Sequence, residues 1–243
     1  MNLEGKVAVI TGASRGLGAG MADAFSRAGL KLGVCARSEP AHSDSDQVLA
    51  QQLDVSDEQA VDDFAERVFE RFGHVDLWIN NAGVLAPVAP LREVQSAEFR
   101  RALEVNVMGV FHGTRAYVRR CRKYGRPGVL VNISSGAATS AYAGWSAYCA
   151  SKAAVELMTA VVAAEEADTE LRCHAVAPGV IDTDMQAMIR STPRENFPMV
   201  DKFMEMKEKG TFSSAEWVAQ HMLELAFGAG SSEISIRFPP ERH

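Results

Sequence analysis

Short apolar runs alternate along the chain with stretches in which apolar residues recur every three or four positions. Runs of this length predict buried β-strands, and the longer spacing predicts amphipathic helices. Because the two kinds of segment alternate from end to end, the pattern predicts an α/β fold with one doubly wound parallel sheet, in a single domain. The predicted strands are Lys6–Thr11, Lys31–Ala36, Val48–Leu53, Val75–Ile79, Gly128–Ile133, Leu171–Val176 and Glu233–Phe238.

Capping residues mark where several of the predicted helices begin. Ser56 with Gln59, and Ser213 with Glu216, have the spacing of a capping box. Glycine ends the first two helices, at Gly29 and after Phe72. The predicted helices are Met21–Ala28, Ser56–Phe72, Ala97–Tyr124, Ser146–Glu166 and Ser213–Phe227.

One segment interrupts the alternation, from about Thr183 to Thr211, and has no strand character. Five of the ten methionines lie in it. Flexible thioether side chains suit a mobile substrate lid over a broad apolar pocket. Helical core packing accounts for Met185, Met188 and Ile189 equally well, so both interpretations stand.

Composition narrows the classes of protein to consider. The 243 residues are 47% hydrophobic and 23% charged, as in a compact globular domain. Lys and Arg number 25 against 31 Asp and Glu, a net charge of −6, which argues against nucleic-acid partners and anionic membranes. The sequence has no apolar run of membrane-spanning length, and its polar start shows no secretory signal, so we expect the cytoplasm. The four cysteines form no close pair, which predicts reduced thiols and no metal site.

A basic cluster of Arg115, Arg119, Arg120, Arg122, Lys123 and Arg126 lies at the end of a predicted helix. Cations there complement the negative end of the helix dipole. We therefore interpret the cluster as a solvated helix end and not as an RNA-binding patch.

A glycine-rich turn, Thr11–Gly18, joins the first strand to the first helix. This context presents backbone N–H groups and a helix N-terminus to a pyrophosphate. Gly12 permits the turn, Gly16 permits close approach to phosphate, and Gly18 permits tight helix packing. The predicted nucleotide contacts in this turn are Gly12, Ser14, Arg15, Gly16, Leu17 and Gly18.

The end of the second strand indicates which dinucleotide is bound. An acidic residue there usually binds the ribose 2′-hydroxyl of NAD, but this chain has Ala36 followed by Arg37. A guanidinium at this position, with Arg15, suits the 2′-phosphate of NADP. We therefore expect NADP(H) as cofactor, against the alternative that Arg37 only faces water.

Tyr148 and Lys152 are four residues apart at the start of a predicted helix, so they share one face. A free phenol has a pKa near 10, and a nearby ammonium together with an oxidised nicotinamide should lower it toward neutrality. The pair is therefore a candidate proton donor with a tuning group. Taken alone, the spacing also fits a surface lysine beside a half-buried tyrosine.

Several motifs occur in a fixed order: Thr11–Gly18, Asn80-Asn81-Ala82-Gly83, Asn106, Asn132-Ile133-Ser134-Ser135, Tyr148–Lys152, and Pro178-Gly179 with Thr183. In this combination the chain resembles the short-chain dehydrogenase/reductase family over nearly its whole length, which implies a Rossmann fold and a nicotinamide cofactor. The resemblance implies that Ser135 binds the substrate carbonyl and Tyr148 donates the proton. It also implies that Lys152 binds the nicotinamide ribose and that Asn106 holds a relay water. Ser134 points the other way by strand alternation.

The resemblance extends the set of expected cofactor contacts. Asn80 and Asn81 could be turn formers, but Gly83 directly after them suggests backbone close to adenosine. Asp54 could equally begin a turn or lie near adenine. The further expected cofactor contacts are Asp54, Val55, Asn81, Ala82, Gly83, Tyr148, Lys152, Pro178, Gly179, Val180 and Thr183.

Around the substrate side the chain resembles the sepiapterin reductase and benzil reductase branch, which reduces vicinal dicarbonyls with NADPH. Gly144-Trp145, Tyr148-Cys149-Ala150, 182–186 and 207–210 carry this likeness. Trp145 and Met185, with Ser135 and Tyr148, are the expected substrate contacts. Between Ser231 and Pro239 there is no aspartate of the kind that anchors a pterin, which argues against a pterin substrate. Residues 38–47 are too short and too polar for the helix usual in the family.

These observations predict an NADPH-dependent reductase of a ketone or 1,2-dicarbonyl. One alternative is an NAD-dependent secondary-alcohol dehydrogenase, which Arg37 disfavours. Another is a catalytically idle NADP-binding protein, which would not need an acid group. The expected partner is a small carbonyl substrate. The two long helices resemble the faces on which the family associates, so we expect a homodimer or homotetramer.

Overall fold

The computed structural model describes residues 2–242 and contains a seven-stranded sheet. Its strand order is β3-β2-β1-β4-β5-β6-β7, and every neighbouring pair is parallel. The predicted doubly wound fold is confirmed, and each predicted strand has a counterpart. The strands are β1 (Val7–Thr11), β2 (Lys31–Ala36), β3 (Val48–Gln52), β4 (Leu77–Asn80), β5 (Val129–Ile133), β6 (Arg172–Ala177) and β7 (Ser235–Arg237).

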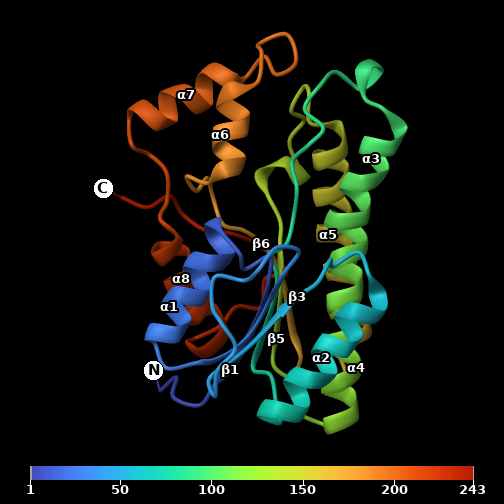
Figure 1. Ribbon diagram of the computed structural model, residues 1–243, viewed down its shortest axis with the longest axis vertical. Coiled ribbons are helices and arrows are strands. Elements are labelled where there is room, and N and C mark those ends of the chain that lie inside the picture. The colour runs from blue at the N-terminus through green and yellow to red at the C-terminus, as the bar shows by residue number, and fades with distance from the viewer. Residues whose placement is uncertain (1, 243) are drawn as a thin grey trace.

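Helices cover both faces of the sheet (Figure 1). The helices α1 (Gly16–Arg27) and α8 (Ala215–Phe227) lie on one face. The helices α2 (Glu58–Phe72), α4 (Gly109–Tyr124) and α5 (Ser146–Glu165) lie on the other. This arrangement buries both faces of the central strands, which is why these strands are apolar at successive positions.

Strand β1 shows how the sequence divides between the two layers. Ala8 and Ile10 pack in the cluster that contains residues of α1 and α8, such as Phe25. Val7 and Val9 point the opposite way, into the cluster of α2 and α4 residues. Because side chains alternate along a strand, one apolar run contributes residues to both hydrophobic cores.

Two predicted helix caps are wrong by one residue. The first residue before α2 is Asp57, whose carboxylate accepts the Ala60 N–H at 3.1 Å. The cap of α8 is Ser214, whose hydroxyl accepts the Trp217 N–H at 3.0 Å. The Ser56 hydroxyl instead donates to Asp54 at 2.7 Å and accepts from Arg101 at 3.0 Å. Ser213 instead joins β-type pairing, since its N–H donates to the Val180 carbonyl.

The predicted helix Ala97–Tyr124 contains an irregularity. It consists of α3 (Ser96–Leu103), a π-helical segment η2 (Glu104–Met108) and α4, with helical backbone throughout. Asn106 lies inside η2. A π-helical turn inside an α-helix often marks a functional site, and this one lies beside the candidate site described below.

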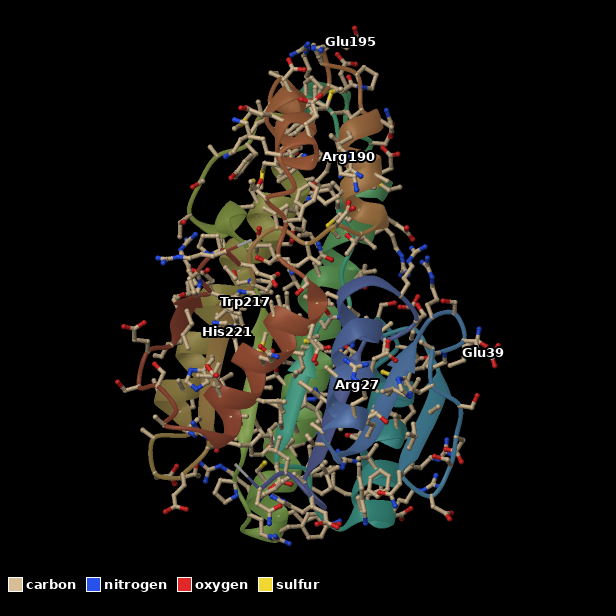
Figure 2. All side chains as sticks on the ribbon, turned by 90° about the vertical axis from the view of Figure 1, so that its left-hand side faces the viewer. Arg27, Glu39, Arg190, Glu195, Trp217 and His221 are labelled. Atoms are coloured by element: carbon tan, nitrogen blue, oxygen red, sulfur yellow. The ribbon has the colours of Figure 1, made fainter. Side chains whose placement is uncertain are left out.

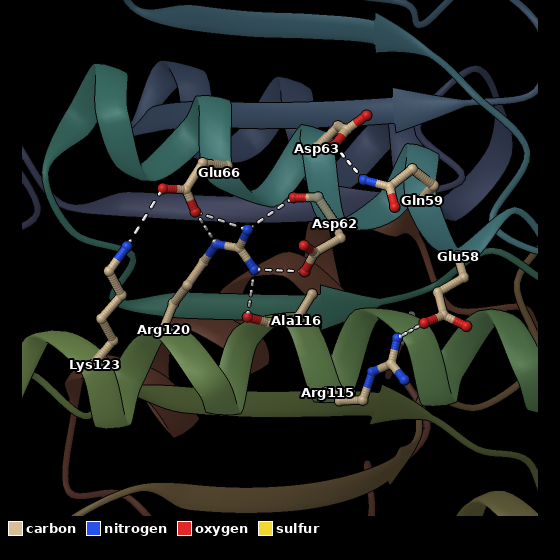
Figure 3. Close-up of polar contacts among 9 residues, drawn as sticks. All are labelled: Glu58, Gln59, Asp62, Asp63, Glu66, Arg115, Ala116, Arg120 and Lys123. Carbon is tan, nitrogen blue, oxygen red and sulfur yellow. Dashed lines mark hydrogen bonds and ion pairs between the residues drawn. The ribbon is translucent and has the colours of Figure 1, made fainter.

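The basic cluster on α4 is not a simple solvated helix end, so that prediction is wrong for Arg120. Its side chain is only 6% exposed and pairs with Asp62 and Glu66, each at 2.9 Å (Figure 3). Lys123 pairs with Glu66 at 3.6 Å. The cluster therefore joins α4 to α2. The sequence interpretation missed this because the acidic partners lie on a different helix.

The insertion (residues 183–211) is helical. It contains α6 (Asp184–Ser191) and α7 (Val200–Glu208), at one end of the molecule (Figure 1). Arg190 and Glu195 mark this end in Figure 2. Residues 38–47 contain no helix, as predicted, and Glu39 points outward at the side of the molecule (Figure 2). Two short 3₁₀ segments, η1 (Leu91–Glu93) and η3 (Gly136–Ala138), complete the described elements.

Helix α5 is long and apolar enough to pass a composition test for a membrane span, with mean hydropathy 1.3 over its best window. The same test is passed by core helices of globular proteins. Helix α5 begins with the buried residues Tyr148 and Lys152, and it packs against β6 and η3. We therefore interpret it as a helix of the fold, with an apolar outer face considered below.

Candidate active site

The sequence-predicted site residues gather where β1, β4, β5 and β6 end, beside the start of α5 and of the insertion. In a doubly wound sheet this edge is where ligands bind. The sequence motifs are far apart along the chain: most lie at the carboxyl ends of strands, while Asn106 lies in η2 and Tyr148 and Lys152 lie in α5. The parallel sheet therefore brings them to one edge.

The glycine turn has the geometry that its sequence predicts. Gly12 has φ +71°, and a Cβ there would lie 2.7 Å from the Cα of Ala82. A Cβ at Gly18 would overlap the carbonyl oxygen of Gly12. Arg15 precedes α1 without any side-chain cap, and the first turn of α1 has no acidic residue. The N-terminus of α1 is thus open to an anion.

The two asparagines at the end of β4 make different hydrogen bonds. Asn81 donates from Nδ2 to the Thr11 carbonyl at 2.8 Å and fixes the glycine turn, while Thr11 Oγ1 accepts the N–H groups of Asn81 and Ala82. Asn80 belongs to β4 and donates to Asn132 Oδ1 at 2.8 Å inside the sheet layer. Neither residue is merely a turn former.

Ser135, Tyr148 and Lys152 come together as predicted. The hydroxyl of Tyr148 lies beside the Ser135 side chain, which favours the phenolate. Lys152 donates from Nζ to the Ile133 carbonyl at 2.7 Å, and its Nζ lies 5.6 Å from the centre of the Tyr148 ring. Tyr148 is 9% exposed and Lys152 is 4% exposed. The three groups therefore form a compact, water-poor cluster.

Burial sets the pKa values of the two ionisable groups. Burial raises the pKa of Tyr148 above its ordinary value, and the hydrogen bond from Ser135 offsets part of this. Burial also lowers the pKa of Lys152 to about 8. The expectation that Lys152 lowers the Tyr148 pKa is therefore wrong for the chain by itself. Its Nζ binds Ile133 and lies over the ring, and the cost of desolvating a phenolate dominates.

Asn106 is fully buried within η2. Its Oδ1 accepts the Val84 N–H at 2.8 Å, and its Nδ2 donates to the Val84 carbonyl at 2.8 Å and to Ser151 at 3.0 Å. Both amide hydrogens are used, so one lone pair on Oδ1 is left for a water. A Cβ at Gly83 would lie 3.3 Å from this oxygen and 3.8 Å from Lys152 Nζ. Asn106 thus holds the chain after β4 beside Lys152.

The expected adenosine-side residues have clear local roles. Asp54 accepts from the N–H and the hydroxyl of Ser56 and pairs with Arg101 at 2.5 Å. Asp54 therefore stabilises the turn that follows β3. Arg37 is exposed, and its backbone carbonyl accepts from Gln52 Nε2 at 2.9 Å. Arg15 pairs at 3.1 Å with Asp184 of α6, both largely exposed.

The residues after β6 continue the same edge. Gly179 has φ +89°, and the Val180 carbonyl accepts the Ser213 N–H. The Thr183 methyl would lie 3.1 Å from a Cβ at Gly16, so the insertion begins against the glycine turn. On the opposite side, Val55 is buried and its carbonyl contacts His112.

An apolar cluster surrounds Tyr148. It combines Trp145 and the predicted contact Met185 with residues of the insertion. Met185, Met199 and Met206 pack on it, while Met188 and Met204 are exposed, so core packing is confirmed for Met185 and Ile189 and is wrong for Met188. The sequence interpretation missed several members, which only the fold brings close. These are Leu85, Val88, Ala137, Phe197, Val200 and Phe203.

A model of the short chain dehydrogenase family matches residues 6–194. The benzil reductase of Bacillus subtilis is 31% identical over 224 residues, which cover 89% of this chain and 91% of that protein. The benzil reductase of Bacillus cereus is 39% identical over 149 residues, 60% of each chain.

The crystal structure of the KRED1-Pglu enzyme superposes with a TM-score of 0.83 at 32% identity, covering 94% of this chain and 97% of that one. The resemblance drawn from the motifs is thereby confirmed at the level of the family and of its benzil reductase branch. The chain belongs to the short-chain dehydrogenase family, and it is an oxidoreductase that uses a nicotinamide cofactor.

Proposed function

We propose that the protein reduces a ketone or 1,2-dicarbonyl to the alcohol, with NADPH as the reductant. The observation that carries this proposal is the meeting of the Tyr148 hydroxyl, the Ser135 side chain and Lys152 beside an apolar cluster. It joins a phenol proton donor to a hydroxyl that can bind the same substrate oxygen.

Side chains of the protein account for the polarisation and protonation of the carbonyl oxygen. When bound, the reduced nicotinamide supplies a hydride to the carbonyl carbon. Ser135 donates a hydrogen bond that polarises the carbonyl oxygen, and Tyr148 donates the proton that converts the developing alkoxide to the alcohol. Because burial raises its pKa, Tyr148 holds its proton at neutral pH, as an acid in the reductive direction must. Lys152 keeps two of its three ammonium hydrogens for a ribose, since one is bonded to Ile133.

The glycine turn fits a dinucleotide. Close packing leaves no space for a side chain at Gly12 or at Gly18, and the uncapped start of α1 can bind a pyrophosphate. Arg15 and Arg37 favour NADPH, since the position after β2 carries no acidic residue. One charge-assisted hydrogen bond to the 2′-phosphate corresponds to about a tenfold to hundredfold preference.

The substrate class follows from the surroundings of Tyr148. Leu85, Trp145, Val180 and Met185 belong to the apolar cluster, which favours an uncharged, bulky carbonyl compound. The similarity to two benzil reductases supports the same class.

The decisive experiment follows loss of reduced-nicotinamide absorbance with benzil, isatin, sepiapterin and simple ketones, using NADPH and NADH in parallel. We expect turnover of benzil with NADPH and little with sepiapterin. A preference for NADH with a secondary alcohol as substrate would favour the alcohol dehydrogenase alternative. Tight NADPH binding with no turnover of any carbonyl would favour the idle binding protein.

We also propose a homo-oligomer, a dimer or tetramer, in the cytoplasm. Leu157 on α5 is 70% exposed, Val161 is 48% exposed and Met108 on η2 is 39% exposed. Such an apolar helix face is suited to cover the same face of a second copy. The four cysteines are free thiols, which fits a reducing compartment.

A further inference from the structure

Trp145 lies between two aromatic rings of its own chain. Tyr142 stacks on it at 4.8 Å between ring centres, and Phe197 stacks at 4.7 Å with only 3° between the planes. Trp145 is 5% exposed. Stacking on both sides leaves only the edge of the indole for any other partner.

That edge contacts the ring of Tyr148. The two ring centres are 5.7 Å apart at an angle of 83°, an edge-to-face contact. Trp145 precedes Tyr148 by three residues, at the start of α5. The orientation of the indole therefore restricts the orientation of the phenol.

The far partner in this stack belongs to the insertion. Phe197 lies between α6 and α7 and is fully buried. Next to it, the Asn196 carbonyl packs so closely on Gly144 that a Cβ at Gly144 would overlap it. The connection between α6 and α7 therefore packs on Gly144 and Trp145, the two residues that directly precede α5.

We infer that Phe197 and Trp145 are positioning residues that make the proton donor Tyr148 depend on the docking of the 183–211 insertion. This inference rests on the proposed function, because it assigns Tyr148 the role of acid. Neither residue needs to touch substrate or cofactor. The insertion then does more than enclose the pocket: its docked state fixes the phenol and keeps water from it.

Hydration of the Tyr148 phenol changes its pKa, which gives a way to detect the positioning role of Phe197 and Trp145. Burial is the main cause of the raised Tyr148 pKa, and the hydrogen bond to Ser135 opposes it. The ionisable side chains beside the phenol are Lys152 and Cys149, both on α5. The residues of the insertion in this cluster are apolar, so undocking the insertion from Trp145 hydrates the phenol and leaves the local charges unchanged. Undocking should therefore lower the Tyr148 pKa.

The test compares Phe197→Leu with Ile189→Ala. The first removes the ring stacked on Trp145 and keeps an apolar side chain. The second removes buried apolar volume from the same insertion, where Ile189 is 1% exposed, and leaves the stack intact. Phe197→Tyr keeps the ring and serves as the conservative rescue. For each we would measure Tm, the pH profile of carbonyl reduction, and phenolate absorbance, with the Tyr148→Phe variant subtracted.

We expect Phe197→Leu to lower kcat about tenfold or more, since small misplacements of reacting groups are costly. Its Tyr148 titration should move to lower pH, and Phe197→Tyr should restore both values. Ile189→Ala should lower Tm at least as much while the Tyr148 titration stays in place. Equal losses of kcat in the Phe197→Leu and Ile189→Ala variants, with no movement of either titration, would overturn the inference. Absence of carbonyl turnover in the wild type would refute the proposed function, while the phenolate titration would still decide this inference.

Discussion

Ser134 donates from Oγ to Glu156 Oε1 at 2.8 Å, two turns of α5 beyond Tyr148. It is the middle member of a series. Ile133 accepts from Lys152, and the Ser135 side chain lies beside the Tyr148 hydroxyl, so three consecutive residues from the end of β5 contact three residues spaced by four along α5. The series fixes the register between the strand and the helix.

Glu156 should therefore support catalysis without contacting substrate. Glu156→Leu removes the acceptor, and we expect kcat for carbonyl reduction to fall about threefold to tenfold as α5 loosens against β5. Glu156→Gln keeps an acceptor oxygen and should retain most of the activity. Steady-state kinetics of the two variants at saturating NADPH measure the effect. Identical kcat values for Leu and Gln would show that this contact does not position the site.

Arg120 should contribute to stability through the contact of α4 with α2. It is buried, and it bonds Asp62, Glu66 and the Ala116 carbonyl. Arg120→Ala removes the buried partner of Asp62 and leaves Glu66 only its longer contact with Lys123, and it should lower the free energy of unfolding by about 2–3 kcal/mol. Arg119→Ala, at an exposed neighbouring position, should change it by less than about 0.5 kcal/mol. Urea denaturation at pH 7 measures both, and equal effects would contradict the assignment.

The ion pair of Arg120 with Asp62 predicts that the stability of the protein depends on pH. Arg120 holds the pKa of the Asp62 carboxyl below its usual value by a hydrogen bond. A depressed carboxyl pKa adds stability above the unfolded value of about 4, and that stability is lost as the pH falls further. The difference between wild type and Arg120→Ala should therefore shrink below about pH 4.

Arg37 should determine the preference for NADPH over NADH. Arg37→Leu removes a guanidinium that has no acidic partner and should reduce the ratio of the two kcat/KM values about tenfold to hundredfold. Arg126→Leu, an exposed cation just after α4, is the control and should leave the ratio unchanged. An unchanged ratio in Arg37→Leu would mean that Arg15 alone binds the phosphate or that the cofactor is NAD.

Leu157 should contribute to the association of two copies of the protein through α5. Leu157→Glu places a charge on the exposed apolar face of that helix, and light scattering should show a shift toward smaller species. Leu91→Glu, at a position 67% exposed on η1, should not alter the mass. A wild-type protein that is monomeric at tens of micromolar would contradict the proposal.

The sequence predicts the strands and the doubly wound class because the alternation of apolar runs and helical spacings is a local pattern. Each predicted strand forms, and the glycine turn has the expected conformation at Gly12. The motif residues Ser135, Tyr148 and Lys152 meet because the start of α5 packs beside the end of β5 and η3. The resemblance carried by the order of the motifs predicts this meeting.

What the sequence misses depends on contacts between distant elements. Arg120 is read as solvated because Asp62 and Glu66 lie on another helix. The stack of Phe197 on Trp145 needs the insertion to fold back onto α5, and no local pattern indicates that. The direction of the Tyr148 pKa depends on burial, which a helical spacing of four does not reveal.

Tyr148→Phe tests the central claim most directly, because it removes one hydroxyl and keeps the ring that contacts Trp145. Benzil reduction by NADPH should fall by about 10² to 10⁴, the usual contribution of a positioned acid. NADPH affinity, followed by fluorescence titration, should stay within about twofold. Turnover equal to that of the wild type in this variant would contradict the account.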